Sequence, residues 1–213
     1  MIFWEAVIST RDLSKSGHLQ IDSDPIGLGV ERACYIHPDD PGKAVKVSVK
    51  RRNLQSKREI KYYTKLAKRH DLKFDHLPKY YGTIETNLGD GFIVELVRDY
   101  DGQISKSLNW YLAHGFPVEN LPPYLESLKR FLLKNLIIFN YDMKSSNLLL
   151  QKYSSENARL VIIDGLGDTV YIEWLNNFTS HVESKINRRW ERFIKSLYAS
   201  REVKAQLTTE RKL

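Results

Sequence analysis

A short polar run, Asp142-Met-Lys-Ser-Ser-Asn147, combines side chains that suit the handling of a phosphorylated, metal-bound ligand, and it lies between two apolar segments. The carboxylate of Asp142 can accept or orient the proton of a hydroxyl group. Lys144 can stabilise charge on a transferring phosphoryl group, and the amide oxygen of Asn147 can ligate a metal ion. The alternative is an ordinary surface loop, because the same residue types are common there.

A second carboxylate, Asp164, ends the apolar segment 160–163 and is followed by Gly165. Such a step is also an ordinary turn. The order along the chain is what favours chemistry: a loop with an Asp and an Asn, then a hairpin, then an Asp carried by a strand. Two-magnesium phosphoryl transfer uses this order, so we expect a magnesium site between Asn147 and Asp164.

Lys46 lies two residues after Ala44 on an expected strand. Alternate residues of a strand share a face, so if Ala44 faces a cleft and leaves room for adenine, Lys46 faces the same cleft. A buried lysine needs an anionic partner. Glu59 is the candidate, because on a helix over 55–69 it shares a face with apolar positions. In the alternative interpretation, both side chains are solvated.

Gly27-Leu-Gly29 is expected to cover the phosphates of the nucleotide. A full G-x-G-x-x-G loop would have a third glycine where this chain has Arg32. We therefore expect a looser phosphate loop, or one in which Arg32 itself contacts phosphate. Glu95 and Val97, at the end of a later strand, complete the expected nucleotide-binding set.

Strand and turn patterns dominate the first half of the chain, and helical patterns dominate the second. Strands are expected at 27–29, 33–36, 44–47, 77–86 and 92–97, with turns at 38–42 and 87–91 and one helix at 55–69. Helices are expected at 107–113, 122–136 and within 173–206, and short strands at 148–150 and 160–163. This order predicts an α+β fold in one domain, residues 1–213, with an antiparallel β-rich N-lobe (18–97) and a small helical C-lobe (98–213).

Composition limits the class of protein. The single cysteine, Cys34, excludes an internal disulfide framework and a cysteine-built zinc site. No secretory signal or membrane-spanning run is visible, so we expect a cytoplasmic protein. The net charge of +7 favours anionic partners, although solvated lysines and arginines explain it equally well.

Together these motifs resemble the protein kinase superfamily, and more closely the bacterial YrbL family, which is linked with the PhoP regulatory network. The resemblance runs from about residue 20 to about residue 198 and implies a kinase-like two-lobe fold that uses ATP and Mg²⁺. The similar stretches are Gly27-Leu-Gly29, Cys34-Tyr-Ile-His-Pro-Asp39, Lys46, Glu59-Ile-Lys-Tyr-Tyr63, Leu77-Pro-Lys-Tyr-Tyr-Gly-Thr-Ile-Glu-Thr86, Lys144-Ser-Ser-Asn147 and Arg189-Trp-Glu-Arg-Phe193.

Several positions depart from the kinase pattern. Asn140 and Tyr141 replace the usual histidine and arginine before Asp142, and glycine replaces phenylalanine after Asp164. No A-P-E motif follows, and the short remainder of the chain leaves little room for a peptide-docking platform. A small molecule, a glycan or a lipid is therefore as plausible an acceptor as a protein hydroxyl.

Two functions follow, and a third is disfavoured. The leading hypothesis is an ATP-dependent phosphotransferase. The alternative is a catalytically weak or inactive kinase-like protein that binds nucleotide and serves as a regulatory or adaptor protein, with a regulatory protein as its partner. A nucleic-acid-binding protein is disfavoured, because no helix-turn-helix, zinc or aromatic-stripe signature is present.

Overall fold

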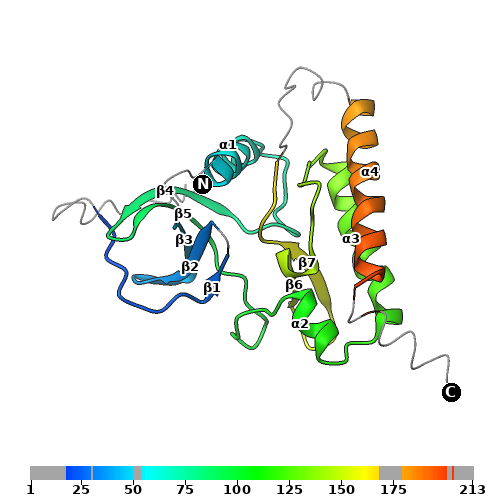
Figure 1. Ribbon diagram of the computed structural model, residues 1–213, viewed down its shortest axis with the longest axis horizontal. Coiled ribbons are helices and arrows are strands. Elements are labelled where there is room, and N and C mark those ends of the chain that lie inside the picture. Colours follow the sequence, from blue (N-terminus) through cyan, green and yellow to red (C-terminus); the bar gives the residue numbers. More distant parts are fainter. Residues whose placement is uncertain (1–17, 30, 50–53, 168–178, 201–202, 204–213) are drawn as a thin grey trace, which may run out of the picture.

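The computed structural model describes residues 18–29, 31–49, 54–167, 179–200 and 203. A five-stranded antiparallel sheet in the order β1-β2-β3-β5-β4 forms the first half (Figure 1). Its strands are β1 (Gly27–Leu28), β2 (Arg32–His37), β3 (Asp40–Ser48), β4 (Tyr80–Thr86) and β5 (Gly89–Glu95). This is the predicted antiparallel, β-rich first half.

The two turns predicted between strands, at 38–42 and 87–91, are both shorter in the structure. Strand β3 already begins at Asp40, which pairs with His37. The expected turn over 87–91 contains only two loop residues, because Thr86 pairs directly with Gly89. Gly91 lies within β5, where an added Cβ would come within 2.8 Å of the Lys46 carbonyl oxygen. This glycine therefore marks a close approach of two strands rather than a turn.

Strand β3 is central and buried on both faces. Ala44 belongs to the main core, whereas Val45 and Val47 pack on the other face in a smaller cluster with Ile21. The alternation of side chains is therefore preserved although all these positions are buried. Lys46 consequently lies on the Ala44 face, the face that α1 (Leu54–Ala67) covers.

Helix α1 is the one helix expected beside this sheet, and it lies next to β4 and β5 in Figure 1. Its buried face carries Glu59, Tyr63 and Leu66, which lie three or four residues apart. The rings of Tyr63 and Tyr80 stack with their centroids 5.6 Å apart. This packing fixes the helix on the sheet and determines where Glu59 points.

The second half is mainly helical, as predicted, and carries a separate two-stranded antiparallel sheet. Helices α3 and α4 lie side by side at its outer edge (Figure 1). No helix within the described ranges is both long enough and apolar enough to cross a membrane. The elements are α2 (Leu108–Ala113), η1 (Val118–Asn120), α3 (Leu121–Lys134), η2 (Ser145–Asn147), β6 (Leu148–Lys152), β7 (Ala158–Ile162) and α4 (Thr179–Tyr198).

The helix boundaries differ slightly from the predictions. Helix α3 ends at Lys134 rather than at Leu136, whose φ of 51° is incompatible with a right-handed helix. The last helix was expected within 173–206, and α4 supplies 179–198 of that range. Of the rest, residues 173–178, 201–202 and 204–206 lie outside the described part of the chain.

His76 joins β7 to α3 and provides a pH-dependent test of this packing. It is 6% exposed, its Nδ1 lies 2.7 Å from the Leu160 carbonyl oxygen, and its Nε2 lies 3.3 Å from the Ser127 hydroxyl. Burial lowers the pKa of His76, against the opposing effect of the Leu160 hydrogen bond. The unfolded chain therefore binds this proton more readily than the folded chain, so stability falls as pH drops below about 6.5.

We expect the melting temperature of the wild type to fall between pH 7 and pH 5, and to fall less in His76→Gln. The control is His70→Gln, because His70 is exposed and should leave the pH profile unchanged. Thermal unfolding at closely spaced pH values measures the effect. Parallel profiles for wild type and His76→Gln would show that His76 does not cause the dependence.

Candidate functional site

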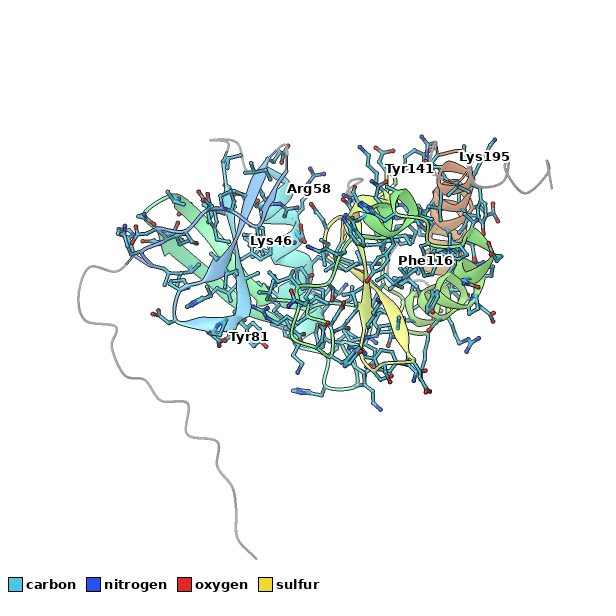
Figure 2. All side chains as sticks on the ribbon, turned by 90° about the horizontal axis from the view of Figure 1, so that it is seen from below. Lys46, Arg58, Tyr81, Phe116, Tyr141 and Lys195 are labelled. Atoms are coloured by element: carbon cyan, nitrogen blue, oxygen red, sulfur yellow. The ribbon has the colours of Figure 1, made fainter. Side chains whose placement is uncertain are left out.

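Lys46 and Glu59 form a buried ion pair between the sheet and α1. The Lys46 Nζ lies 3.4 Å from Glu59 Oε1, and the two residues are 8% and 1% exposed. Lys46 also donates a hydrogen bond to the carbonyl oxygen of Ile163, next to Asp164. Figure 2 places Lys46 between the five-stranded sheet and the second half of the chain. The pair is thus positioned by β3 and α1 and reaches across to the end of β7.

Arg32, the first residue of β2, completes a cluster of four charged side chains. One guanidinium nitrogen donates to Glu59 Oε2 and the other to Asp164 Oδ1. Arg32 is 7% exposed. The ring of Phe92 lies under both cations, with its centroid 5.8 Å from Arg32 Cζ and 5.5 Å from Lys46 Nζ. The cluster therefore contains two cations and two carboxylates.

The cluster shifts the proton affinities of its members. Burial raises the pKa of Glu59, and the charges of Lys46 and Arg32 oppose this. Burial would also raise the pKa of Asp164, but the same two cations outweigh it and lower that pKa. Burial would lower the pKa of Arg32, yet Glu59 and Asp164 raise it. Asp164 is therefore held as a carboxylate, the form that ligates metal ions.

The polar loop around Asp142 lies against the segment that carries Asp164. The backbone N–H of Asn140 donates to the carbonyl of Gly165 at 2.6 Å, and that of Ile163 donates to Asn147 at 3.0 Å. Gly165 has a φ of 84°, and a Cβ there would lie 3.8 Å from the Asn147 Nδ2. The sequence-predicted Asn147 and Asp164 thus come to the same place, although they are far apart in the chain.

Asp142 and Lys144 are exposed, in contrast to the buried cluster. The Asp142 side chain is 77% exposed, and its Oδ1 lies 4.0 Å from the guanidinium of Arg192 on α4. Arg192 also stacks on the ring of Tyr141, 3.8 Å from the centroid, and donates to its hydroxyl. Asp142 therefore faces solvent next to α4, and Lys144 is exposed as well.

The other expected nucleotide-binding positions lie on β1, β3 and β5 and in the segments that follow β1 and β5. Gly27 lies in β1, and the N–H of Gly29 donates to the Arg32 carbonyl at 2.7 Å. Ala44 is 3% exposed on the Lys46 face. Glu95 ends β5, but its carboxylate accepts a hydrogen bond from the backbone of Lys79 at 3.2 Å. Val97 is 5% exposed, and its carbonyl accepts from Ser105 at 3.1 Å. These last two lie where the sheet connects to the helical half.

Sequence reasoning missed three residues that hold the loop in place. Arg189 of α4, 4% exposed, donates to the carbonyl of Phe139. Arg192 contacts Tyr141, as described above. From α1, the hydroxyl of Tyr62 accepts a hydrogen bond from the N–H of Ile138 at 2.7 Å. The signal for the two arginines was available, since both lie in the family-like stretch 189–193.

The ligand set near Asp164 fits magnesium. A carboxylate and an amide oxygen are hard oxygen donors, and Mg²⁺ typically takes one or two protein ligands and completes its shell with phosphate oxygens and water. Within the described part of the chain, no group of three or more His, Cys, Asp and Glu side chains could hold a metal ion alone. Asp164 and Asn147 would therefore hold magnesium together with a phosphate ligand.

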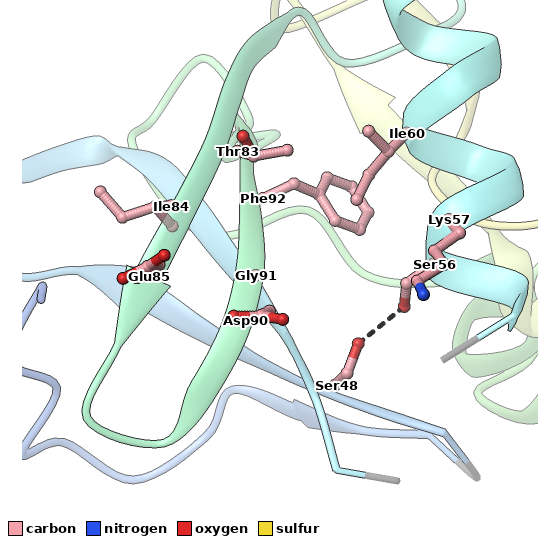
Figure 3. A pocket seen from close by; sticks show the side chains of 10 residues that line it. All are labelled: Ser48, Ser56, Lys57, Ile60, Thr83, Ile84, Glu85, Asp90, Gly91 and Phe92. Carbon is pink, nitrogen blue, oxygen red and sulfur yellow. Dashed lines mark hydrogen bonds between the residues drawn. The ribbon is translucent and has the colours of Figure 1, made fainter. Parts of the chain in front are cut away.

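A cavity of about 350 Å³ lies beside the cluster, between α1 and strands β4 and β5 (Figure 3). Ser48 and Ser56 form a hydrogen bond of 3.0 Å across one side of it. Phe92 lines this cavity and also lies near Lys46. None of the expected nucleotide-binding, catalytic or metal residues lines it, so it is separate from the candidate site.

The chain is similar to known proteins in sequence and in fold. A family model described as PhoP regulatory network protein YrbL matches residues 19–198. The uncharacterized YrbL proteins of Escherichia coli (strain K12) and Shigella flexneri are each 31% identical over 180 residues, which cover 81% of this chain and 84% of the relative.

Among solved structures, the crystal structure of Rad53 1–466 in complex with AMP-PNP is similar, with a TM-score of 0.51 and 18% identity. The similarity covers 78% of this chain but only 44% of the Rad53 chain, so this chain spans less than half of that protein. It supports the predicted kinase-like fold and says nothing of activity. On the extent of the family match and of the identity to its relatives, the chain belongs to the YrbL family of PhoP regulatory network proteins.

Proposed function

We propose that the chain is an ATP- and Mg²⁺-dependent phosphotransferase whose acceptor carries a hydroxyl group. The observation that supports this proposal is that the buried Lys46–Glu59 pair is linked to Asp164. Arg32 bridges Glu59 and Asp164, and Lys46 donates to the carbonyl of Ile163, the residue before Asp164. Buried charges are costly unless they are paired, and this pairing concentrates them at the expected phosphate position. A kinase-like fold uses such a pair to hold nucleotide phosphates.

Each residue of the site has a distinct role in this proposal. Lys46, held by Glu59, binds the α- and β-phosphates, and Gly27 and Gly29 cover them. Asp164 and Asn147 would hold the magnesium ion, which neutralises charge on the phosphates when it is bound.

The remaining roles are binding of adenine and transfer itself. Ala44, Glu95 and Val97 line the adenine side, at the connection between the sheet and the helical half. Asp142 accepts the proton of the acceptor hydroxyl, and Lys144 stabilises charge on the transferred group. Because both side chains are exposed, a small molecule, a glycan, a lipid or a protein hydroxyl can reach them.

The alternative is a catalytically weak or inactive YrbL protein that binds nucleotide and acts through a regulatory protein partner. One observation favours it: Arg32 already occupies Asp164, the carboxylate that a magnesium ion would need. Under this alternative the Lys46–Glu59 pair still serves nucleotide binding, but Asp142 contributes nothing to a reaction.

The proposal also concerns the organisation of the whole chain. We infer one kinase-like domain over residues 1–213, with an N-lobe at 18–97 and a reduced C-lobe at 98–213. The change from sheet to helix after β5 supports this division. We further infer a cytoplasmic protein, since ATP is available there and the sequence contains one cysteine.

Thermal unfolding with and without ATP and Mg²⁺ tests nucleotide binding. A ligand that binds only the folded chain stabilises it by about 2.7 kcal/mol at 100 times its Kd. We expect wild type to be stabilised and Asp164→Asn to lose this stabilisation. The matched control is Asp75→Asn, because Asp75 is exposed and pairs with Arg159 away from the site. No stabilisation of wild type at millimolar ATP would reject the proposal.

A further inference from the structure

The guanidinium of Arg32 lies beside the carboxylate on which the proposed magnesium site depends. Its two nitrogens donate to Glu59 and to Asp164 Oδ1, and the same Oδ1 accepts a hydrogen bond from the Gly165 N–H at 2.6 Å. The Arg32 side chain is 7% exposed and that of Asp164 is 32% exposed, so this contact is partly shielded from solvent and from salt. A cation of the chain itself is therefore already bound where a metal ion is expected.

Among the described residues of the cluster, the positive and negative charges are equal in number. Arg32 and Lys46 carry two positive charges, and Glu59 and Asp164 carry two negative charges. A divalent cation at Asp164 would add two positive charges next to Arg32. At such short range inside a protein the repulsion is strong, so Mg²⁺ and Arg32 compete for the same carboxylate.

We propose that Arg32 is a lock on the metal site: its guanidinium holds Asp164 in place of a divalent cation and must leave before the cation binds. This inference rests on the proposed function, because it concerns the same Asp164. It also goes beyond that function, since it makes metal binding dependent on a residue that a full glycine-rich loop would not contain.

The position of Arg32 explains how the lock can open. Arg32 is the first residue of β2 and follows the glycine segment Gly27–Gly29 in the chain. Its carbonyl accepts a hydrogen bond from the N–H of Gly29. Nucleotide phosphates under that segment offer a guanidinium two parallel hydrogen bonds, at least as favourable as those to carboxylates. We therefore infer that the phosphates draw Arg32 away from Asp164 and that the metal ion binds with or after the nucleotide.

Titration with Mn²⁺ in the absence of nucleotide tests the lock. The affinity for Mn²⁺ is measured from the electron paramagnetic resonance signal of the free ion. If Arg32 has left Asp164 in about one molecule in ten, the metal ion binds wild type about tenfold more weakly than it binds a site that is always open. We expect Arg32→Gln to bind Mn²⁺ about tenfold more tightly than wild type, and Arg32→Gln combined with Asp164→Asn to lose that gain. Arg159→Gln is the matched control, because Arg159 also bridges two side chains but does so on β7.

A second variant, Arg32→Lys, keeps the test possible if Arg32→Gln does not fold. Arg32→Lys cannot bridge Glu59 and Asp164 with a planar fork but keeps the positive charge, so it should bind Mn²⁺ more tightly than wild type and less tightly than Arg32→Gln. Equal Mn²⁺ affinity in wild type and in the folded Arg32 variants, including no binding in any of them, overturns the lock.

Thermal unfolding with ATP and Mg²⁺ distinguishes a failure of the lock from a failure of the proposed function. If neither wild type nor Arg32→Gln is stabilised, nucleotide binding is rejected, whatever the Mn²⁺ result. If Arg32→Gln is stabilised at lower Mg²⁺ than wild type, the lock is supported by a second measurement. If both are stabilised but bind Mn²⁺ alone with equal affinity, the lock is overturned although the nucleotide site stands.

Discussion

Replacement of Glu59 by alanine should lower the free energy of unfolding by about 3–5 kcal/mol, because it leaves two buried cations without their shared carboxylate. Glu59 is 1% exposed and pairs with both Lys46 and Arg32. Lys46 retains its hydrogen bond to a carbonyl and its contact with the Phe92 ring, and Arg32 retains Asp164. This is among the largest effects that a single polar substitution can have.

Urea unfolding of wild type and Glu59→Ala measures this effect. Glu85→Ala is the matched control, because Glu85 lies on β4 with an exposed side chain and should change stability by less than about 0.5 kcal/mol. Combining Glu59→Ala with Lys46→Met should recover part of the loss, since one unpaired cation is then removed. If Glu59→Ala proves as stable as Glu85→Ala, Glu59 is not the partner of buried cations in solution.

Much of the first half of the fold could be predicted, because its patterns are local. Glycines, prolines and alternating apolar residues predicted each strand within a few residues, and the same alternation placed Ala44 and Lys46 on one face. The turn over 87–91 was predicted too long. The reason is that Gly91 was interpreted as a turn residue, whereas it serves the close approach of β3 and β5, which no local pattern reveals.

The candidate site could be predicted in part, for a similar reason. Asn147 and Asp164 follow a spacing that reflects chemistry, and the hairpin between them brings them together. The partners of Arg32 could not be predicted from spacing, because Glu59 lies on α1 and Asp164 lies two residues beyond β7 rather than on the strand as expected. The substitution itself was visible, and either a looser phosphate loop or a contact between Arg32 and phosphate was the expected consequence.

The contacts of α4 with the loop could not be predicted from the sequence either. Its arginines were recognised as part of a family-like stretch, but their contacts with Phe139 and Tyr141 join segments about fifty residues apart. Arg189 donates to the backbone carbonyl of Phe139, and Arg192 donates to the side-chain hydroxyl of Tyr141. Both contacts depend on how α4 packs, so no local pattern of the sequence reveals them.

Replacement of Asp142 by asparagine should separate the two functions that remain open. If the chain transfers phosphoryl groups, we expect the rate to fall by about 10²–10⁴-fold, because asparagine cannot take the proton of the attacking hydroxyl. Stabilisation by ATP and Mg²⁺ should stay unchanged, since Asp142 is 77% exposed and stands apart from the buried cluster. The thermal stability of the chain itself should change little for the same reason.

Release of phosphate from radiolabelled ATP, and its transfer to the chain itself, measures this rate without knowledge of the acceptor. Asp101→Asn is the matched control, because Asp101 is also exposed but lies in the connection after β5. A slow wild-type turnover that Asp142→Asn abolishes and Asp101→Asn preserves would identify Asp142 as the proton acceptor. Equal turnover in wild type and Asp142→Asn would exclude that role. Stabilisation by ATP without any turnover would favour the nucleotide-binding regulatory protein, because the buried cluster then serves binding while the exposed loop serves no reaction.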